Sequence, residues 1–320
     1  MASGIGNAAH GAVQCGLGWL VASANPFSFP GRLLKGNLHT HTKRSDGTLS
    51  PEETVAWFRD RGRYDFVVLT DHRVLAETDA LCSEGFTVVP GVELHPGKNE
   101  LGHAHHIVCV GVTGPAELPG LDSPQEVLTT VDEAGGVCFA AHPRWHGCTF
   151  RDLIALEGYA GVEVFNTTCS ALNGKGDSTV IWDDLLARGR RVFGVAVDDA
   201  HLARMDYFGG WVMVRTDDAS PDGIVAALKA GAFYSSCGPE IRSLEVTQSH
   251  LKLECSPVRS VHVVSRGPVG VSFMDPGGAL MDGVDCTLGG MDTYLRVQVV
   301  DASGMSAWTN PFYLDELPPE

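Results

Sequence analysis

From residue 33 onward, short apolar runs alternate with segments that have the pattern of amphipathic helices. The apolar runs are rich in branched residues and have the length of buried strands; they span 33–40, 65–72, 86–94, 106–112, 136–143, 161–166, 191–201 and 210–216. Helix-like segments at 50–62, 122–136, 178–190 and 220–231 separate most of them. The first begins with Ser50 and Pro51 and ends at Gly62, as capped helices do. Strand and helix in turn predict a parallel barrel of the β/α type.

The pattern changes beyond residue 240. Short alternating strands at 243–248, 250–255, 261–266, 294–301 and 311–316 are separated by Gly, Pro and Asp turns, with no helix-like segment between them. We therefore predict a small β-sandwich-like domain over 241–320, attached to a barrel domain over 31–240. Residues 1–30 are expected to form an N-terminal extension that is partly disordered.

Side chains that bind metal ions stand where most of the predicted strands end. His39 and His41 end the first strand, and Glu93 ends the third. The carboxyl ends of barrel strands meet at one rim, and residues two apart on a strand share a face. Of the 13 histidines, ten lie between residues 39 and 201, most of them at strand ends. The sequence therefore predicts a metal centre built from His39, His41, Asp46, His72, Glu93, His142, Asp199 and His201, together with His105 or His106.

This set has more donors than one cation needs, since a catalytic zinc takes three protein ligands and a water. It predicts two or three divalent cations, with Glu93 bridging two of them. Imidazole and carboxylate donors without thiolate favour zinc, manganese or iron. Two neighbouring cations would hold a hydroxide at neutral pH and stabilise the charge that develops on the group under attack. Asp198, beside Asp199, is an alternative ligand.

Several polar residues close to these positions are candidates for catalysis and substrate binding. An arginine at the pocket mouth would grip a phosphate or carboxylate, or would instead be a solvated loop charge; the candidates are Arg44, Arg73, Arg144 and Arg204. His95 and His146 are candidates for proton transfer. Asp71 and Asn166 are candidates for orienting a ligand or the substrate. We assign catalytic roles to His201, Arg144 and Asp71, and substrate contacts to Arg144, Arg73, Asn166 and His95.

Composition narrows the partners and the location. The net charge is −16, so a nucleic-acid phosphate backbone would find no basic face, and a small-molecule substrate is expected instead. The nine cysteines are scattered without a C-x-x-C pair, which favours free thiols and a cytoplasmic location. The apolar run at 11–24 ends in Ala-Ser-Ala like a signal peptide but has no basic residue before it, so export is the alternative. No apolar run reaches the length of a membrane span, and no membrane partner is expected.

Five motifs carry a family likeness: HTHTKRSDG at 39–47, LTDH at 69–72, GVE at 91–93, AHP at 141–143 and DAH at 199–201. In this order on a β/α background, they resemble the PHP (polymerase and histidinol phosphatase) superfamily over residues 35–240. The resemblance implies a distorted seven-stranded TIM-like barrel, (β/α)7, with a trinuclear metal centre. It also implies hydrolysis of phosphate esters.

Residue by residue, the resemblance implies three ligand sets. The first is His39, His41, Glu93 and Asp199; the second is Glu93, His142 and a histidine of the fourth strand; the third is Asp46, His72 and His201. The family pattern places the fourth-strand ligand directly before the strand, at His106 rather than His105. Its D-x-H motif favours Asp199 over Asp198.

The chain also resembles a PHP branch that has a C-terminal β-domain and includes carbamate-cleaving metallohydrolases. The segments that carry this likeness are KGNLHTHT at 35–42, GAFYSSCGPEI at 231–241 and VVDASGMSAWTNPFYL at 299–314. We expect a phosphoesterase acting on small phosphomonoesters or phosphodiesters. Hydrolysis of a carbamate, amide or other non-phosphate group is the alternative. A metal-binding module without turnover is a third hypothesis, which the retention of ligand types in every motif disfavours.

Overall fold

The computed structural model describes residues 25–319. The signal-like run at 11–24 and most of the predicted N-terminal extension lie outside the described residues. Within 25–319, no helix combines the length and the apolar character that crossing a bilayer requires.

Each of the eight apolar runs predicted as a strand contains one. The strands are β1 (Arg32–Asn37), β2 (Phe66–Leu69), β3 (Thr87–Leu94), β4 (Ile107–Val110), β5 (Val137–Ala140), β6 (Gly161–Asn166), β7 (Phe193–Val197) and β8 (Trp211–Thr216). β2, β4, β5 and β7 are buried along their whole length, as in sheets covered on both faces. Four neighbouring pairs are parallel: β1–β2, β2–β3, β5–β6 and β6–β7. The mixed α/β fold with parallel strands is therefore confirmed.

The four helix-like segments are helical. They contain α1 (Pro51–Ala56), which continues as a π-helical turn η2 (Trp57–Arg61), α2 (Pro124–Glu133), α5 (Thr179–Ala187) and α6 (Pro221–Lys229). Ser50 and Glu53 form a reciprocal capping box at the start of α1. The sequence does not predict α3 (Phe150–Ile154) and α4 (Thr167–Asn173), because helices of 5 and 7 residues are too short to display a helical period. Single 3₁₀ turns are η1 (Pro26–Ser28), η3 (Asp79–Leu81) and η4 (Leu118–Gly120).

Strand directions differ from an all-parallel barrel at two places. β4 pairs antiparallel with β3 and β5, and β8 pairs antiparallel with β1. The segments that lead into β4 and β8 contain no helix, so the chain turns back instead of making the crossover that a parallel pair needs. The prediction of a wholly parallel barrel is therefore wrong at these strands. Because β4 is reversed, Ile107 at its start pairs with Leu94 and Ala140 at the ends of β3 and β5.

The ends of β1 and β7 meet. Ala200, just after β7, forms a parallel bridge with Thr40, just after β1. The N–H of His41 donates a hydrogen bond of 2.9 Å to the carbonyl of Ala200. Among these eight strands the hydrogen-bonded order is β8-β1-β2-β3-β4-β5-β6-β7. The first and last strands of the predicted barrel therefore approach each other where the ligand residues lie, and a fully closed barrel remains a prediction.

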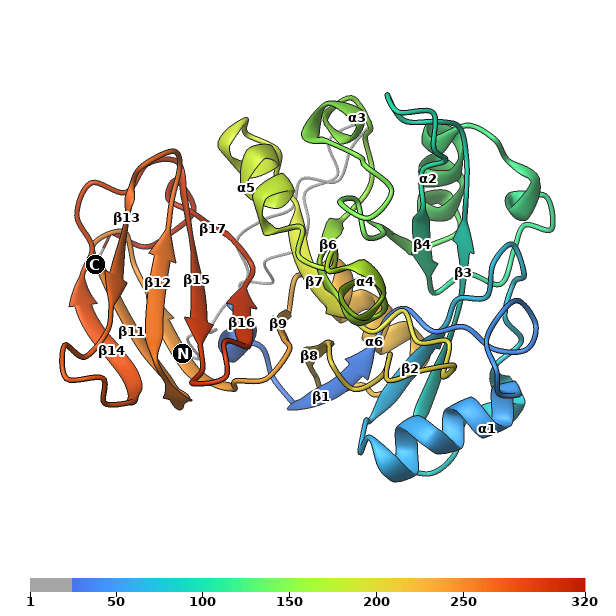
Figure 1. Ribbon diagram of the computed structural model, residues 1–320, viewed down its shortest axis with the longest axis horizontal. Helices are drawn as coiled ribbons and strands as arrows, with labels where there is room; N and C mark the ends of the chain where they lie inside the picture. The colour runs from blue at the N-terminus through green and yellow to red at the C-terminus, as the bar shows by residue number, and fades with distance from the viewer. Residues whose placement is uncertain (1–24, 320) are drawn as a thin grey trace, which may run out of the picture.

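The C-terminal part is mostly sheet (Figure 1). The strands β9 (Phe233–Ser236), β12 (Ser260–Val264), β13 (Gly270–Phe273), β15 (Tyr294–Val300) and β16 (Ser306–Thr309) extend the first sheet, because β16 pairs with β9. β17 (Phe312–Tyr313) pairs with β15. A second sheet contains β10 (Ile241–Val246), β11 (His250–Val258) and β14 (Met281–Thr287). Side chains of both sheets, among them Leu253 and Val297, form a second hydrophobic core. Since the β9–β16 pairing spans the predicted boundary at residue 240, the division into two domains stays a prediction.

An ion pair between a buried arginine and a partly exposed aspartate ties the C-terminal strands to the first part. Arg296 of β15 is 1% exposed and donates two hydrogen bonds of 2.7 Å to Asp183 of α5. Its guanidinium also lies 4.9 Å from the ring centre of Trp182. A two-pronged arginine–carboxylate pair of this kind fixes both distance and orientation between the two elements.

We expect the Arg296→Ala variant to be destabilised by about 2–4 kcal/mol, because it loses both charged hydrogen bonds and the buried stem of the side chain. Urea unfolding followed by circular dichroism measures this loss. The matched control is Arg242→Ala, whose exposed pair with Glu240 at 3.6 Å should contribute less than about 1 kcal/mol. Equal stability of the two variants would contradict the role of the Arg296–Asp183 pair.

Candidate metal centre

Imidazole and carboxylate side chains from separate strands converge into one cluster. Five overlapping groups have ligand atoms that lie within 4.8 Å of one another. The groups are His41, Asp46, His72 and His201; His39, His142 and Asp199; His39, His41 and Glu93; His72, Glu93 and His95; and Glu93, His106 and His142. The structure thus brings together all the side chains expected as ligands, and His95 joins them.

Glu93, near the end of β3, is fully buried at the centre of the cluster. Its Oε2 lies 3.3 Å from Nε2 of His39 and 3.4 Å from Nε2 of His41. It also lies 2.7 Å from Nδ1 of His72, without forming a hydrogen bond. Oε2 of Glu93, Nδ1 of His72 and Nε2 of His95 are buried without hydrogen-bond partners. Buried polar atoms are nearly always partnered, so converging unpartnered lone pairs fit a site for cations.

The second oxygen of this carboxylate, Oε1, lies 2.7 Å from Nδ1 of His106 and 3.4 Å from Nε2 of His142. Asp199 is shared in the same way. Its Oδ1 lies 3.0 Å from Nε2 of His41 and 3.3 Å from Nε2 of His39. Its Oδ2 lies 3.8 Å from Nε2 of His142. Each carboxylate therefore faces two neighbouring groups of imidazoles, which suits a ligand that bridges adjacent cations.

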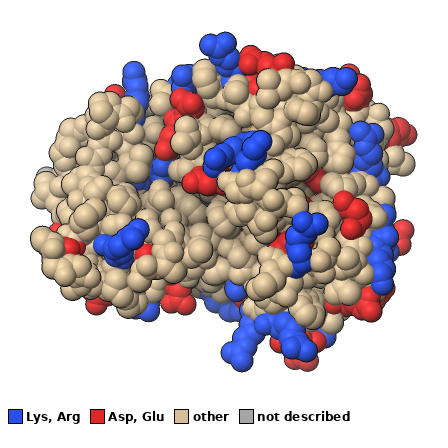
Figure 2. Space-filling view, in the orientation of Figure 1, with Lys and Arg blue, Asp and Glu red and all other residues tan. Residues whose placement is uncertain are grey.

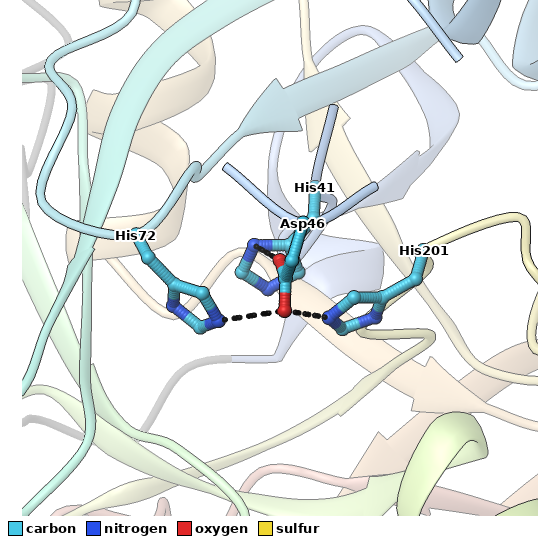
Figure 3. Close-up of side chains that lie close together, drawn as sticks. All are labelled: His41, Asp46, His72 and His201. Atoms are coloured by element: carbon cyan, nitrogen blue, oxygen red, sulfur yellow. Dashed lines mark ion pairs between the residues drawn. The ribbon is translucent and has the colours of Figure 1, made fainter. Parts of the chain in front are cut away.

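Asp46, on the loop after β1, forms a further group with three histidines. Its Oδ2 lies between the rings of His72 and His201, 3.5 Å and 3.3 Å from their Nε2 atoms (Figure 3). Its Oδ1 lies 3.8 Å from Nδ1 of His41. Nδ1 of His201 donates a hydrogen bond of 2.8 Å to the carbonyl of Asp199, so the lone pair of this ring is on Nε2. The atom that faces Asp46 is therefore the one able to bind a cation.

Two ligand residues have left-handed backbone conformations. The φ angle is +27° at His142 and +56° at Asp199, which costs a residue other than glycine about 1–3 kcal/mol. Backbone hydrogen bonds hold both turns. The N–H of His142 donates to Oε2 of Glu163 at 2.8 Å, and the N–H of Ala200 donates to the carbonyl of His39 at 3.3 Å. The chain thus tolerates strain where it turns these two side chains into the cluster.

Glu163 of β6 is a site residue that the sequence analysis misses. This fully buried carboxylate accepts a hydrogen bond of 2.6 Å from Nδ1 of His39 through Oε1. Through Oε2 it accepts a hydrogen bond of 2.9 Å from the amide of Asn166 and the hydrogen bond from the backbone N–H of His142. The bond to Nδ1 leaves Nε2 of His39 facing Glu93 and fixes the ring. The available signal was an acid in the middle of the apolar strand GVEVFN.

Asn166 and His146 orient other ligands. The side-chain NH2 of Asn166 donates a hydrogen bond of 3.3 Å to Oδ2 of Asp199. The side-chain oxygen of Asn166 accepts a hydrogen bond from the N–H of Cys169 and so caps α4. Nδ1 of His146 lies 3.3 Å from Nδ1 of His142. Burial, followed by the neighbouring histidines, lowers the pKa of His146 to about 2, so this ring is neutral and accepts the hydrogen bond. The proton transfer expected of His146 stays a prediction.

Asp71 lies outside the five groups. It accepts hydrogen bonds of 2.7 Å from the backbone N–H and the hydroxyl of Thr42 and from the hydroxyl of Ser45. These bonds hold the loop that carries Asp46. The geometry supports a positioning role for Asp71, and the catalytic role expected of it stays a prediction.

The structure separates two pairs of neighbouring candidates. His106 faces Glu93, whereas Nδ1 of His105 lies 3.7 Å from the thiol of Cys148 and outside the groups. Asp198 lies outside them as well and accepts hydrogen bonds of 2.8–2.9 Å from the backbone N–H groups of residues 208–210. Burial raises the pKa of Asp198 to about 6, although these hydrogen bonds oppose the shift.

A cavity of about 340 Å³ opens over the cluster. Seven of the ligand residues line it, together with Trp145, Thr168, Cys169, Leu172, Ala203, Arg204 and Asp206. Arg144 and Arg73 are exposed and are not among the lining residues. Their guanidinium groups donate hydrogen bonds of 3.2 Å to the carbonyls of Asp177 and His95. The substrate contacts predicted for these two arginines remain predictions.

The clustered charges shift the pKa values of the ligands. Burial disfavours a charged imidazole, yet Asp46 and Glu93 raise the pKa of His72 to about 10. The pKa of His39 is likewise raised against burial, by Asp199, Glu163 and Glu93. Burial raises the pKa of Asp199, and the neighbouring histidines lower it. The histidines have the larger effect, so the pKa of Asp199 lies below its usual value. Protons on these imidazoles thus neutralise the buried carboxylates, a role that bound cations would take over.

No family model matches the sequence. The uncharacterized protein MJ1587 of Methanocaldococcus jannaschii is 30% identical to this chain over an alignment of 149 residues; the match covers 42% of this chain and 82% of that protein. The chain belongs to the same family as this archaeal protein.

A solved structure from Bacteroides vulgatus aligns with 93% of this chain and 97% of its own length, at a TM-score of 0.50 and 14% identity. That two-domain protein contains a predicted PHP-like metal-dependent phosphoesterase. The chain therefore shares the fold of this two-domain protein. An amidohydrolase from Chromobacterium violaceum, with bound sulfate and no metal, aligns with 52% of this chain and 87% of its own length, at a TM-score of 0.41 and 18% identity.

The ligand sets that the PHP resemblance implies can be compared with the geometry. Glu93, His106 and His142 form one of the five groups. Asp46, His72 and His201 form another, which His41 completes. The remaining expected set is divided between two groups, which both contain His39. The number of cations stays a prediction.

We expect Glu163→Gln to weaken cation binding about 10–100-fold. A glutamine amide puts an NH2 donor in place of one carboxylate oxygen, so the variant loses either the hydrogen bond from His39 or those from Asn166 and the backbone of His142. Equilibrium dialysis with metal analysis measures the affinity, and circular dichroism verifies the fold. Glu84→Gln changes an exposed acid in the same way and should bind as the parent protein does. Parent-like affinity of the Glu163 variant would remove its assigned role.

We expect cation uptake near neutral pH to release protons. The pKa values of His39, His72 and His201 are raised, so these rings hold protons that a cation must displace. Affinity should therefore increase as the pH rises and decrease as it falls. Titration calorimetry in HEPES and in Tris, whose ionisation enthalpies differ, counts the released protons. A heat of binding that is the same in both buffers, after correction for buffer–metal binding, would contradict this expectation.

Proposed function

We propose that this protein is a metal-dependent hydrolase of the PHP type that cleaves small-molecule phosphomonoesters or phosphodiesters. The observation that carries the proposal is a set of buried nitrogen and oxygen lone pairs, several of them unpartnered, at the wall of a cavity of about 340 Å³. A cavity of this size suits a small molecule. The ligand sets given above would hold two or three cations of zinc, manganese or iron. When bound, such cations activate water and neutralise charge on the attacked group.

The residues of the chain itself contribute orientation. Nδ1 of His39 is fixed by Glu163, that of His142 by His146, and that of His201 by a carbonyl. Ligands held in one tautomer need no rearrangement during turnover, which favours the transition state. In His201, Nδ1 is held by this carbonyl and Nε2 faces Asp46. We therefore assign His201 to cation binding rather than to proton donation.

His95 is the candidate for a direct substrate contact within the cluster. Its ring lies 4.6 Å from the ring of His72 and 4.2 Å from that of His106, centre to centre. Its Nε2 has no hydrogen-bond partner and lies 3.7 Å from Oε2 of Glu93. The side chain is 20% exposed, although His95 is not among the residues that line the cavity.

Carbamate or amide hydrolysis is the second candidate function. Arg204 is the one arginine among the described residues that line the cavity, so a phosphate group would depend mainly on bound cations for its neutralisation. The apolar wall at Trp145 and Leu172 would accept an aryl or alkyl group equally well. The two functions are distinguished by the choice of substrate.

The surface and the thiols support a small-molecule substrate and a cytoplasmic location. On the face shown in Figure 2, basic and acidic side chains are interspersed and form no continuous basic stripe of the kind that binds nucleic acid. The eight cysteines of the described part are all free. Free buried thiols favour a reducing compartment.

We expect His39→Ala and Glu93→Ala each to lower both bound metal and kcat, the latter by at least about 100-fold, because each removes a ligand shared between groups. Metal analysis is combined with assays on p-nitrophenyl phosphate and on a naphthyl carbamate. His250→Ala removes an exposed histidine paired with Asp285 and serves as the control.

The panel has three separable outcomes. Release of p-nitrophenol supports the phosphoesterase. Turnover of the carbamate without phosphatase activity supports the second candidate. Full metal occupancy without hydrolysis of any member of a broad panel refutes a hydrolase.

A further inference from the structure

His72 presents its two ring nitrogens to two different carboxylates. Its Nε2 lies 3.5 Å from Oδ2 of Asp46, in the group that also contains His41 and His201 (Figure 3). Its Nδ1 lies 2.7 Å from Oε2 of Glu93. A neutral imidazole has one nitrogen lone pair available to a cation, because its other nitrogen carries the proton. His72 can therefore bind a cation on one side of its ring or on the other, but not on both.

His95 places a further imidazole on the Nδ1 side of this ring. It follows Glu93 by two residues at the end of β3, and its Nε2 lies 3.7 Å from the same oxygen, Oε2. That nitrogen is buried and forms no hydrogen bond. His72, Glu93 and His95 form one of the five groups with ligand atoms within 4.8 Å of one another. Ligand atoms around a tetrahedral cation with bonds of about 2.1 Å are about 3.4 Å apart, so these three side chains have the spacing of a cation site.

Backbone contacts fix the relative positions of these three residues. His72 and Glu93 are partners in a parallel bridge where β2 and β3 end. The N–H of Arg73 donates a hydrogen bond of 2.9 Å to the carbonyl of Glu93, and its guanidinium donates one of 3.2 Å to the carbonyl of His95. The ring of His95 also packs between those of His72 and His106. His95 is thus held beside the cluster, and it does not line the cavity.

Glu93 has enough lone pairs to serve this group together with its neighbours. Its Oε2 also faces His39 and His41, and its Oε1 faces His106 and His142. An ionised carboxylate has about four lone-pair sites, two on each oxygen. Contact with His72 and His95 through Oε2 therefore leaves the other groups intact. The limiting ligand of the new group is His72, which Asp46 also requires.

We propose that Nε2 of His95, Oε2 of Glu93 and Nδ1 of His72 form an alternative cation position. This position and the one at Asp46 exclude each other, because both need the single lone pair of His72. None of the ligand sets that the PHP resemblance implies contains His95. The Asp46 position is occupied first, since it has a carboxylate that it does not share with the other groups, and the imidazole of His201 in addition.

The alternative position retains a cation when the contact with Asp46 is lost. The side chain of Asp46 is 53% exposed, so solvent can replace it, whereas that of Glu93 is 1% exposed. Cation binding and the substrate contact considered for His95 use the same nitrogen and are therefore alternatives. The inference rests on the proposed function only for the presence of cations.

The test counts zinc ions per chain at saturating Zn²⁺, by equilibrium dialysis of the full chain followed by metal analysis. We expect Asp46→Ala to keep the zinc content of the parent protein, because the position at His95 takes up the displaced cation. His95→Ala should keep it as well, because the position at Asp46 remains. The double variant Asp46→Ala/His95→Ala should bind one zinc ion fewer than either single variant.

Two further variants separate ligand loss from a loss of structure. Asp46→Ala/His103→Ala removes an exposed histidine from the loop that follows β3, and it should keep the zinc content of Asp46→Ala. Asp46→Ala/His95→Phe keeps a ring between those of His72 and His106 but has no lone pair, and it should lose one zinc ion as the double alanine variant does. Circular dichroism verifies that each variant is folded.

Every other pattern overturns the inference. Parent-like zinc content in folded double variants at Asp46 and His95 would show that His95 is no ligand. Loss of a zinc ion in either single variant would show that the two positions do not substitute for each other. A parent protein that binds no zinc would remove the basis of both positions. If the expected zinc contents are found while neither phosphate nor carbamate esters are hydrolysed, the proposed function fails and the alternative position stands.

Discussion

Two carboxylates, Glu93 and Asp199, are buried within one cluster, and the arrangement around them follows from the need to compensate their charge. Anions removed from water are strongly unfavourable unless cationic or hydrogen-bonding groups surround them. Here imidazoles from five segments of the chain take that position. The same geometry leaves several lone pairs unpartnered, so protons alone satisfy the cluster incompletely. Divalent cations would satisfy it better, which is why the site is best understood as a metal centre.

Much of this could be predicted from the sequence. Apolar runs gave the positions of strands, and histidines at their ends gave the metal centre, because both depend on short-range patterns. Strand direction at β4 could not be predicted, since it depends on whether a helix fits between β3 and β4. Glu163 was missed because a lone acid in an apolar strand gains its meaning only from His39, distant in the sequence.

The reversed direction of β4 allows His106 to reach the site. If β4 ran parallel to its neighbours, the residue before it would lie at the opposite end of the strands from the other ligands. In the antiparallel strand, His106 precedes Ile107, which pairs with the last residues of β3 and β5. The single imidazole that comes from the beginning of a strand thus reaches the same edge as those that come from strand ends. The direction of β4 therefore decides whether His106 lies beside the other ligands.

The pairing of β16 with β9 has a consequence for how the chain can be divided. Tyr234, Ser235 and Ser236 of β9 use their outer edge to pair with β16, and Ser235 also donates a hydrogen bond of 2.8 Å to the carbonyl of Gly194. A fragment that ended at residue 240 would expose this edge as unsatisfied backbone beside β8. Exposed edges of this kind recruit other chains into intermolecular sheets. The C-terminal region therefore covers an edge that would otherwise favour self-association of the first part.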